Sequence, residues 1–579
     1  MRYSDWEICG FDRDIAVDLC RKGVNPLASV FLTSRGVTRI DDALEVLGER
    51  PAKICDPYLM ADMDKAVARI NEAVKNGERI AVYGDYDVDG MTSCAVLAQW
   101  LHTRNADFEI YIPGRLDEGY GLNTPALDAL KSHGVTLVLT VDCGITAIQE
   151  TQYARSIGLD MVITDHHECK ATLPDAVAVV DPKRPDCGYP HKALAGVGVA
   201  FKLVCALEHD YSSEKIFRHY GDLVAIGTIA DVMSVIGENR ELIRRGLRII
   251  NNNPRPGFLQ LLRELYTERG RITTAAVGFV LAPRLNAAGR MSKPEVSVDL
   301  LMTDSDTDAE MLAAELNRLN LERRKLELTI YEEAAAMLPE DGPDGPIILA
   351  RRGWHQGVTG IVAAKMAERY LLPAIIISVD DDGIGRGSCR SFGEFGIYGS
   401  LRKCEDLLIN FGGHEMAAGV TVAEENIDEL RRRVADDYHS SFSALPRPGL
   451  RLDFEVEKPE LLTAGNVAAL SRLEPFGNDN VPPCMCILGG KLSSTQSIGS
   501  GQHTRLRVEK SGKVFDCIFF SMPSEKLGVC EGMLVDIAFE PQINEFRGRT
   551  SVQLHLFDIR PSLRKSEQGN NRQGNRKNG

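Results

Sequence analysis

The sequence predicts an α/β protein: a doubly wound parallel sheet, a long connecting helix, a second α/β domain and a C-terminal OB-fold β-barrel. Three observations favour this fold class. After residue 51, short apolar segments alternate with amphipathic ones, which indicates parallel strands joined by crossover helices. The same alternation starts again after the motif DGPDGP. From about residue 448, short segments alternate with period two between turn signals, which is typical of a small barrel.

The first α/β domain begins with an amphipathic helix that ends at Gly77, DKAVARINEAVKNG. The expected strands after it are RIAVYG, FEIYIP, TLVLTVD and DMVITD. The expected helices between them are MTSCAVLAQWLHTR, NTPALDALKSHG and AIQETQYARSIG. In the second domain, PIILARR and PAIIISV are expected strands around the helix GIVAAKMAERY.

Composition shifts divide the chain into six parts. Residues 303–338 are expected to form one helix of roughly 50 Å, capped by Thr303 or Asp304 and ended by Pro339; two shorter helices with a kink are the alternative. The other parts are an N-terminal extension (1–50) packed on the residues after it, the first domain (51–302), the second domain (339–447), the barrel (448–562) and a disordered basic tail (563–579).

Charge and composition restrict the function classes. The net charge of -15 argues against a general nucleic-acid binder, although it allows an enzyme with a local basic groove. No apolar stretch is long enough to span a membrane, and the N-terminus lacks signal-peptide features, so we expect a cytoplasmic protein. The 14 cysteines contain no C-x-x-C pair, which favours reduced thiols over zinc sites or disulfides.

The motif AVYGDYDVDGMTS places Asp85, Asp87 and Asp89 between a strand and a helix. In an open α/β sheet this is the edge at which ligands bind. Three crowded carboxylates there predict divalent cations. An EF-hand is disfavoured because its twelfth position is Val96 instead of Glu, and because a strand precedes the motif. A solvated acidic turn is the other alternative.

Further polar residues follow at matching places. Asp142 ends TLVLTVD, whereas Asp165, His166 and His167 end DMVITDHH, and Asp231 follows the apolar run AIGTIA. Several carboxylates with a few imidazoles suit Mn²⁺ or Mg²⁺ better than zinc. The candidate ligands exceed the needs of one ion, so two ions are expected. Such a pair hydrolyses phosphate esters without a nucleophilic side chain.

These segments resemble the DHH phosphoesterase superfamily, with DYDVDG, TVDCG, DHH and GTIADVM as its four motifs. The resemblance implies that Asp142, His166 and His167 are catalytic, with Asp142 bridging two ions and His167 touching the scissile phosphate. Asp85 completes the candidate metal set and, with Asp165, would orient or support the ligands. The metal ligands implied by the motifs are Asp87, Asp89, Asp142, His166 and Asp231.

The second domain is similar to the DHHA1 domain that accompanies this superfamily, with GGHEMAAG as its signature. The RecJ branch is indicated by IPGRLDEGYGL, DPKRPDCGYP, PRLNAAGRM, GWHQGVTGIVAAK, GRGSCRSF, LEPFGNDN and NEFRGRTSVQL. This resemblance implies degradation of single-stranded DNA from the 5′ end in repair and recombination. Asp479 stands where the branch more often has glycine; we expect it at the edge of the barrel, away from the chemistry.

The resemblance also suggests residues that bind the strand. Arg115, Ser388 and Arg390 could form a pocket for a 5′-phosphate, and His414 could bind the phosphate being cut. Arg284, Asn286 and Arg290 could hold the backbone of the DNA strand. His355 is a further candidate for binding the substrate. In the barrel the candidates are Phe519, Phe520, Phe546, Arg505, Arg507 and Arg547. Surface salt bridges for the arginines and core packing for the phenylalanines are the alternatives.

Two rival functions are weighed against the exonuclease. One is a phosphodiesterase of short oligonucleotides or cyclic dinucleotides, whose relatives generally lack the barrel. The other is a non-catalytic replication scaffold, which is disfavoured because every matched ligand position is intact. The family role suggests a monomer, a RecQ-type helicase and a single-stranded-DNA-binding protein as partners. The basic tail could capture DNA or only solubilise the chain.

Overall fold

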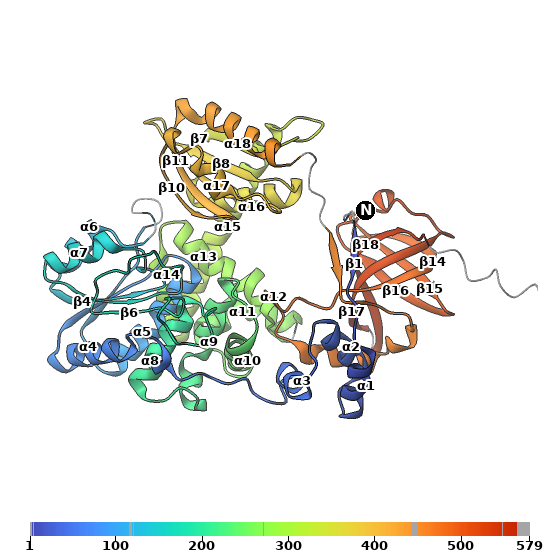
Figure 1. Cartoon of the computed structure of the whole chain (residues 1–579), viewed down its shortest axis with the longest axis horizontal. Coiled ribbons are helices and arrows are strands. Elements are labelled where there is room, and N and C mark those ends of the chain that lie inside the picture. The colour runs from blue at the N-terminus through green and yellow to red at the C-terminus, as the bar shows by residue number, and fades with distance from the viewer. Residues whose placement is uncertain are drawn as a thin grey trace, which may run out of the picture. The chain divides into compact units, whose positions relative to one another are not determined.

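A computed structural model describes Tyr3 and residues 5–114, 119, 121–269, 271–442, 449–546 and 548–563. The chain forms two compact units (Figure 1). The large unit contains Ala52–Pro446 and Pro475–Asn480. The barrel unit contains Met1–Pro51, Arg447–Glu474 and Val481–Gly579.

A five-stranded parallel sheet is the centre of the first domain of the large unit, with strand order β3-β2-β4-β5-β6. Ile80 and Val82 of β2 face one core, whereas Ala81 and Tyr83 face another, so helices cover both faces. The predicted doubly wound sheet is confirmed. The strands are β2 (Arg79–Tyr83), β3 (Phe108–Tyr111), β4 (Val135–Val141), β5 (Asp160–Thr164) and β6 (Ala178–Val180).

Helices α4 (Met63–Asn76), α5 (Val88–Thr103) and α8 (Gly196–Glu208) pack on one face of this sheet. Helices α6 (Thr124–Ser132) and α7 (Ile148–Ser156) pack on the other. A helical layer follows in the sequence, and part of it contributes to the first of these cores. It consists of α9 (Glu214–Ala230), α10 (Gly237–Asn252), α11 (Pro256–Arg269), α12 (Thr274–Ala276), the π-helix η2 (Val277–Leu281), α13 (Ala282–Arg290) and α14 (Pro294–Met302).

The connecting helix α15 (Asp306–Ala336) is a single element of 31 residues, as expected. Its N-cap is Ser305, whose side chain accepts from the Asp308 backbone N–H at 3.3 Å. The expectation of Thr303 or Asp304 as the cap is therefore wrong. Thr303 instead accepts the backbone N–H of Ser305 at 3.1 Å, which is a turn just before the helix.

The second domain has a mixed sheet with the order β10-β11-β9-β8-β7. Only β7 (Ile347–Arg352) and β8 (Ala374–Val379) pair in parallel. Helix α16 (Gln356–Tyr370) packs with α15 on one face. The remaining elements are β9 (Ile384–Arg390), β10 (Leu408–His414), β11 (Ala417–Ala423), α17 (Ile397–Arg402) and α18 (Ile427–Ser441).

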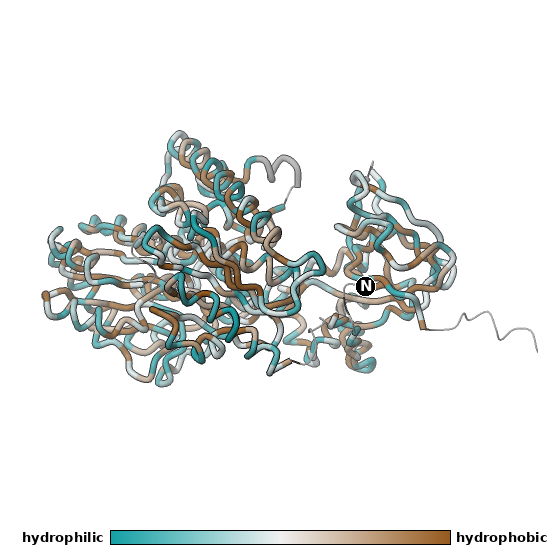
Figure 2. The backbone as a smooth tube through the Cα atoms, turned by 90° about the horizontal axis from the view of Figure 1, so that it is seen from above, coloured by the Kyte–Doolittle hydropathy of each residue, from teal (hydrophilic) through white to brown (hydrophobic). Residues whose placement is uncertain are grey.

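The barrel unit confirms the predicted C-terminal barrel. Strands β14, β15, β16, β18 and β17 pair in that order, and the pairing of β14 with β17 closes the ring. Buried and exposed residues alternate along most of β15, and Figure 2 shows hydrophobic and hydrophilic residues interspersed throughout the chain. The strands are β14 (Met485–Ile498), β15 (His503–Lys510), β16 (Lys513–Phe519), β17 (Leu534–Phe546) and β18 (Arg549–Pro561), beside β13 (Phe454–Glu455) and α19 (Ala464–Ala469).

The N-terminal extension packs on the barrel and not, as expected, on the residues that come after it. Strand β1 (Trp6–Ile8) pairs in parallel with β12 (Leu450–Leu452). Arg35 binds both carboxylate oxygens of Asp453, at 2.8 and 3.1 Å. The helices of this region are α1 (Arg13–Arg21), α2 (Pro26–Ser34) and α3 (Ile40–Val46).

The segment around Asp479 also differs from expectation. Pro475–Asn480 belongs to the large unit although both flanking segments belong to the barrel unit. Asp479 thus packs with the large unit, although it was expected with the barrel. Among the described residues, no helix is long and apolar enough to cross a membrane. All but the first residue of the predicted tail, 564–579, lie outside the described residues.

Candidate metal centre and strand-binding site

Carboxylates and histidines gather at the carboxyl edge of the parallel sheet. Asp85 follows β2 by one residue, Asp142 directly follows β4, and Asp165 directly follows β5. Asp87 caps α5 by accepting from Gly90 N at 3.0 Å. Asp231 is the C-cap of helix α9 and so does not follow a strand.

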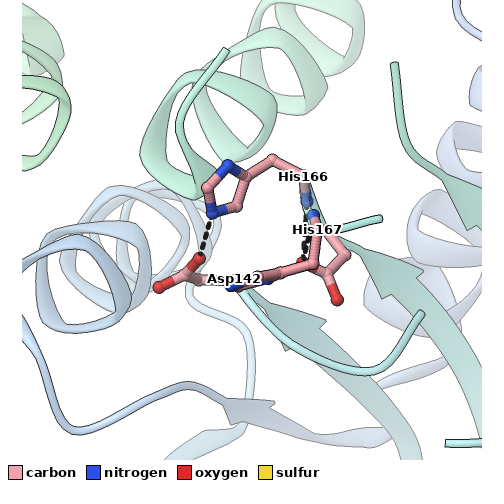
Figure 3. A group of neighbouring side chains, drawn as sticks. Asp142, His166 and His167 are labelled. Carbon is pink, nitrogen blue, oxygen red and sulfur yellow. Dashed lines mark hydrogen bonds and ion pairs between the residues drawn. The ribbon is translucent and has the colours of Figure 1, made fainter. Parts of the chain in front are cut away.

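His166 lies at the centre of this group. Its Nε2 is 3.0 Å from Asp142 Oδ1, 3.6 Å from Asp231 Oδ2 and 3.8 Å from Asp89 Oδ2. Figure 3 shows the His166 ring directed at the Asp142 carboxylate. Asp89, His166 and Asp231 offer ligand atoms within 4.8 Å of one another, and so do Asp85, Asp87 and Asp142. These two groups could hold two cations, with Asp142 next to both.

The electrostatics of the site fit divalent cations. Burial, with the charges of neighbouring carboxylates, raises the pKa of Asp142 and of Asp89 well above the ordinary value. Burial and the charge of Asp87 raise the pKa of Asp231 to about 7. Without cations, these carboxylates resist ionisation because burial and mutual repulsion penalise their charged forms. A bound divalent ion removes that penalty, and oxygen donors with one imidazole suit Mn²⁺ or Mg²⁺.

The two adjacent histidines differ in charge. Burial, with the charge of His167, lowers the pKa of His166 to about 3, so this ring is neutral and able to bind a metal. Burial opposes the charged form of His167 too, but the hydrogen bond and charge of Asp165 raise its pKa to about 9. Asp165 accepts from His167 Nδ1 at 2.7 Å and from Ile145 N at 2.9 Å. Asp165 therefore orients His167.

A second group of predicted residues surrounds the start of α16. Ser388 Oγ is 3.1 Å from Thr359 Oγ1, and a Cβ at Gly360 would lie 3.6 Å from Arg390 Nη2. His355 is the N-cap of this helix. Arg390 pairs with Ala417, which pairs with His414, so these residues form one row across three strands. The N-terminus of this helix and this row are suited to phosphate.

The PRLNAAGRM residues are joined to both groups. Arg290 Nη1 donates to Gly357 O at 3.1 Å, which ties α13 to α16. Asn286 Oδ1 accepts from Val88 N at 3.1 Å, at the start of α5 beside Asp87. Arg284 donates to Asn317 Oδ1 at 2.9 Å. These contacts hold protein segments together around the site. Arg115 lies outside the described residues.

The chain matches three family models: the N-terminal domain of the DHH family over residues 79–228, the DHHA1 domain over 344–439, and the RecJ OB domain over 452–558. It is 38% identical to the single-stranded-DNA-specific exonuclease RecJ of Bacillus subtilis, covering 96% of this chain and 70% of that protein. It is 33% identical to RecJ of Escherichia coli, covering 93% and 96%. The chain belongs to the RecJ family.

Solved RecJ structures agree with this membership. The crystal structure of RecJ from Thermus thermophilus in complex with Mn²⁺ matches with a TM-score of 0.80 and 30% identity, covering 96% of this chain and 79% of that one. The structure of the same RecJ in complex with Mg²⁺ matches with a TM-score of 0.75 and 29% identity, covering 96% and 78%.

In the barrel of this RecJ-family chain, the candidate aromatic residues Phe519 and Phe520 differ in solvent exposure. Phe519 is fully buried and belongs to the core, which was the alternative considered for these phenylalanines. Phe520 is 46% exposed and meets the rings of His503 and His555 edge to face. Arg505 and Arg507 both lie near Asp516, at 3.4 and 3.3 Å. The Phe546 side chain and Arg547 lie outside the described residues.

Sequence reasoning missed the start of α8 as part of the site. Gly196 N and Val197 N donate to the two carboxylate oxygens of Asp89, at 2.7 and 2.8 Å. A Cβ at Gly196 would lie 2.5 Å from Asp142 Oδ1. Only glycine fits between these two carboxylates. The available signal was a glycine beginning an apolar helix, LAGVGVAFKL, in a chain rich in candidate ligands.

Proposed function

We propose that this member of the RecJ family is a metal-dependent exonuclease that hydrolyses phosphodiester bonds of single-stranded DNA from the 5′ end. The observation that carries the proposal is the group of buried Asp89, Asp142 and His166 with the partly exposed Asp231. Its charge requires cations, and the barrel after the second domain provides a fold that holds single strands.

The geometry of the carboxylates and His166 supports a division of the metal-binding roles. Asp87, Asp89, Asp142, His166 and Asp231 would hold two Mn²⁺ or Mg²⁺ ions, and Asp85 would support them. When bound, such ions activate a water molecule and neutralise charge on the phosphate. Asp142 would bridge the ions because it lies beside both groups of ligands. His167, kept protonated by Asp165, would donate a hydrogen bond to an oxygen of the scissile phosphate.

The second domain would fix the end of the strand. Ser388, Arg390 and the start of α16 would bind the terminal 5′-phosphate together with Arg115, and His414 in the same row would bind the next phosphate. Arg284, Asn286, Arg290 and His355 would keep these elements and the strand in place. We extend the proposal to a cytoplasmic monomer acting in DNA repair and recombination beside a RecQ-type helicase and a single-stranded-DNA-binding protein.

The deciding experiment uses strands labelled at either end, with Mn²⁺ present. We expect stepwise loss of label from the 5′ end of a single strand, and little attack on a blunt duplex or a dinucleotide. Activity confined to the dinucleotide would contradict the proposal and favour a phosphodiesterase of short oligonucleotides. Loss from the 3′ end would overturn the assignment of the phosphate pocket.

Asp142→Asn tests the metal centre itself. Asp142 has a φ of 60°, a left-handed conformation that asparagine also adopts readily, so the backbone should be unchanged. The variant loses the charge that bridges two ions, and we expect hydrolysis to fall at least about 100-fold. Circular dichroism and the melting temperature control for folding. Retained hydrolysis in a folded variant would remove Asp142 from the catalytic set.

A further inference from the structure

The loop that carries Asp231 begins with a strained residue. Helix α9 ends at Ala230, and Val232 has a φ of 55° while its N–H donates to Ile229 O at 3.1 Å. Met233 N then donates to Thr228 O at 3.2 Å. Glycine is the usual residue in such a helix ending, and a β-branched residue there is strained because its Cβ crowds the backbone. The Val232 side chain is 67% exposed, so packing does little to hold this conformation.

A distant segment binds both ends of this loop. The side chain of Asn478 donates to Val232 O at 3.2 Å, and the backbone carbonyl of Asn478 accepts from Val235 N at 2.8 Å. Both contacts lie within the large unit. A single residue more than 240 positions away in sequence thus ties the two ends of residues 232–235.

That segment is itself anchored. Arg240 of α10 donates to Pro475 O at 3.1 Å, and Thr274 of α12 donates to Phe476 O at 2.7 Å. Gly477 and Asn480 exchange backbone hydrogen bonds of 2.9 and 3.2 Å, which closes a tight turn. Asp479, the last residue within that turn, has a φ of 60°, where glycine is the least strained residue.

We propose that Pro475–Asn480 is a brace that positions Asp231 for metal binding. The brace holds the strained loop directly after Asp231, whose Oδ2 must stay near His166 Nε2, 3.6 Å away, to share an ion with it. Displacement of the loop would move this carboxylate, and metal sites lose about 10–100-fold in affinity when residues supporting their ligands are removed. The inference rests on the proposed metal-binding role of Asp231.

The brace also affects how the activity of a chain truncated after the second domain is interpreted. The residues on either side of it, up to Glu474 and from Val481, belong to the barrel unit. Removing everything after the second domain therefore removes the brace together with the barrel. A truncated chain would lose metal affinity as well as contacts with DNA, so its activity would not measure the barrel alone.

Gly477→Ala in the full chain is the sharpest test. A Cβ at Gly477 would lie 2.6 Å from Val235 Cγ2, so the brace must move away from the loop. Val235→Ala removes that methyl group, and the double variant should restore the fit. Asp479→Gly is the matched control, because it changes the same turn but relieves strain in it.

Two readouts are independent of turnover. In metal-free protein, we expect Gly477→Ala to speed amide hydrogen exchange at Val235 about 10-fold, because its hydrogen bond to Asn478 is weakened. By titration calorimetry, its affinity for Mn²⁺ should fall about 10-fold. The double variant should recover most of both losses, and Asp479→Gly should match the unaltered chain. Hydrolysis of a short single strand should follow Mn²⁺ affinity.

The outcomes separate this inference from the proposed function. Unchanged exchange and Mn²⁺ affinity in Gly477→Ala would overturn the brace, as would a double variant no better than Gly477→Ala. Asp231→Asn is the reference: if it weakens Mn²⁺ binding while Gly477→Ala does not, the brace alone fails. If Asp231→Asn leaves Mn²⁺ binding unchanged, the metal-binding role of Asp231 fails first.

Discussion

Asp165 interacts differently with the side chains of two neighbouring histidines, His166 and His167. It accepts from His167 Nδ1 at 2.7 Å and keeps that ring charged, whereas it bonds only the backbone N–H of His166. Burial and the charge of His167 leave His166 neutral, with its Nε2 directed at carboxylates that could share a metal. Burial thus keeps one ring neutral, while Asp165 keeps the neighbouring ring charged.

The interaction of Asp165 with His167 predicts how the pH dependence of hydrolysis changes when Asp165 is replaced. In the unaltered chain, the pKa of His167 is raised to about 9, so its charge is present below that pH and lost above it. Asp165→Asn removes the hydrogen bond to a carboxylate and the largest charge that raise the pKa of His167, while burial still lowers it, so His167 should lose its proton at a lower pH than in the unaltered chain. We expect kcat/KM of the variant to fall as pH rises from about 6 to about 8.5.

His167→Gln is the control for this prediction. It should reduce activity at every pH without adding a pH dependence in that range, because no proton is left to lose at this position. An Asp165→Asn profile parallel to that of the unaltered chain would mean that the His167 charge does not act in hydrolysis.

The grouping of residues at the candidate metal centre was largely predictable, because carboxyl ends of parallel strands meet at one edge of a sheet. This rule brings Asp85, Asp142 and Asp165 together from sequence alone. The partners that hold the ligands were not predictable in this way. The backbone N–H groups of Gly196 and Val197 bind Asp89 from more than 100 positions away, and the glycine that begins their helix does not reveal this partner.

At the scale of elements, helix α9 ends with a conflict between sequence and conformation. Val232 occupies the left-handed position where glycine is preferred. We expect Val232→Gly to raise the free energy of unfolding of the large unit by about 1 kcal/mol, because the strain is relieved and the exposed side chain buries little. Urea denaturation of the full chain measures the shift.

Val177→Gly is the matched control for that change. Val177 is also an exposed valine of the large unit, but its backbone lies outside the left-handed region. Glycine there should lower the free energy of unfolding by about 0.5–1 kcal/mol because the unfolded chain gains entropy. Equal effects of the two substitutions would show that Val232 is not strained.

Most elements follow from local patterns, as α4 shows by ending at the left-handed Gly77. The N-cap of α15 could not be predicted from local sequence, because Thr303, Asp304 and Ser305 are all favourable N-cap residues. A turn in which Thr303 accepts the Ser305 N–H precedes the helix and leaves Ser305 as the cap. The brace was also missed. Its motif was recognised, but its partners lie in α10, α12 and the loop after α9, and local sequence does not encode such contacts.

At the scale of the whole molecule, the two units do not follow the order of the sequence. The barrel unit includes the first residues of the chain, whose strand β1 pairs with β12. The large unit includes Pro475–Asn480, although the residues on either side belong to the barrel unit. Hydrophobic periodicity indicates which face of an element is buried but not against what. The fold class was therefore predictable, whereas the exchange of segments between units was not.

The large unit concentrates buried negative charge, which predicts how metal and pH together affect stability. In the metal-free chain the pKa of Asp231 is about 7, above its ordinary value of 3.8. The folded state then holds more protons than the unfolded state between these values, so it loses stability as pH rises through that window. Asp89 and Asp142 act in the same direction.

Mn²⁺ should offset this loss, because it binds the ionised carboxylates of the folded state. We expect chelation to lower the melting temperature more at about pH 8 than at about pH 5.5. Calorimetry with Mn²⁺ or EDTA at both pH values measures the difference. In Asp142→Asn, the difference between the effects of chelation at the two pH values should be smaller, because one buried charge is gone and the ions bind weakly. A larger effect of chelation at the lower pH would mean that the carboxylates are not what makes the metal-free fold less stable.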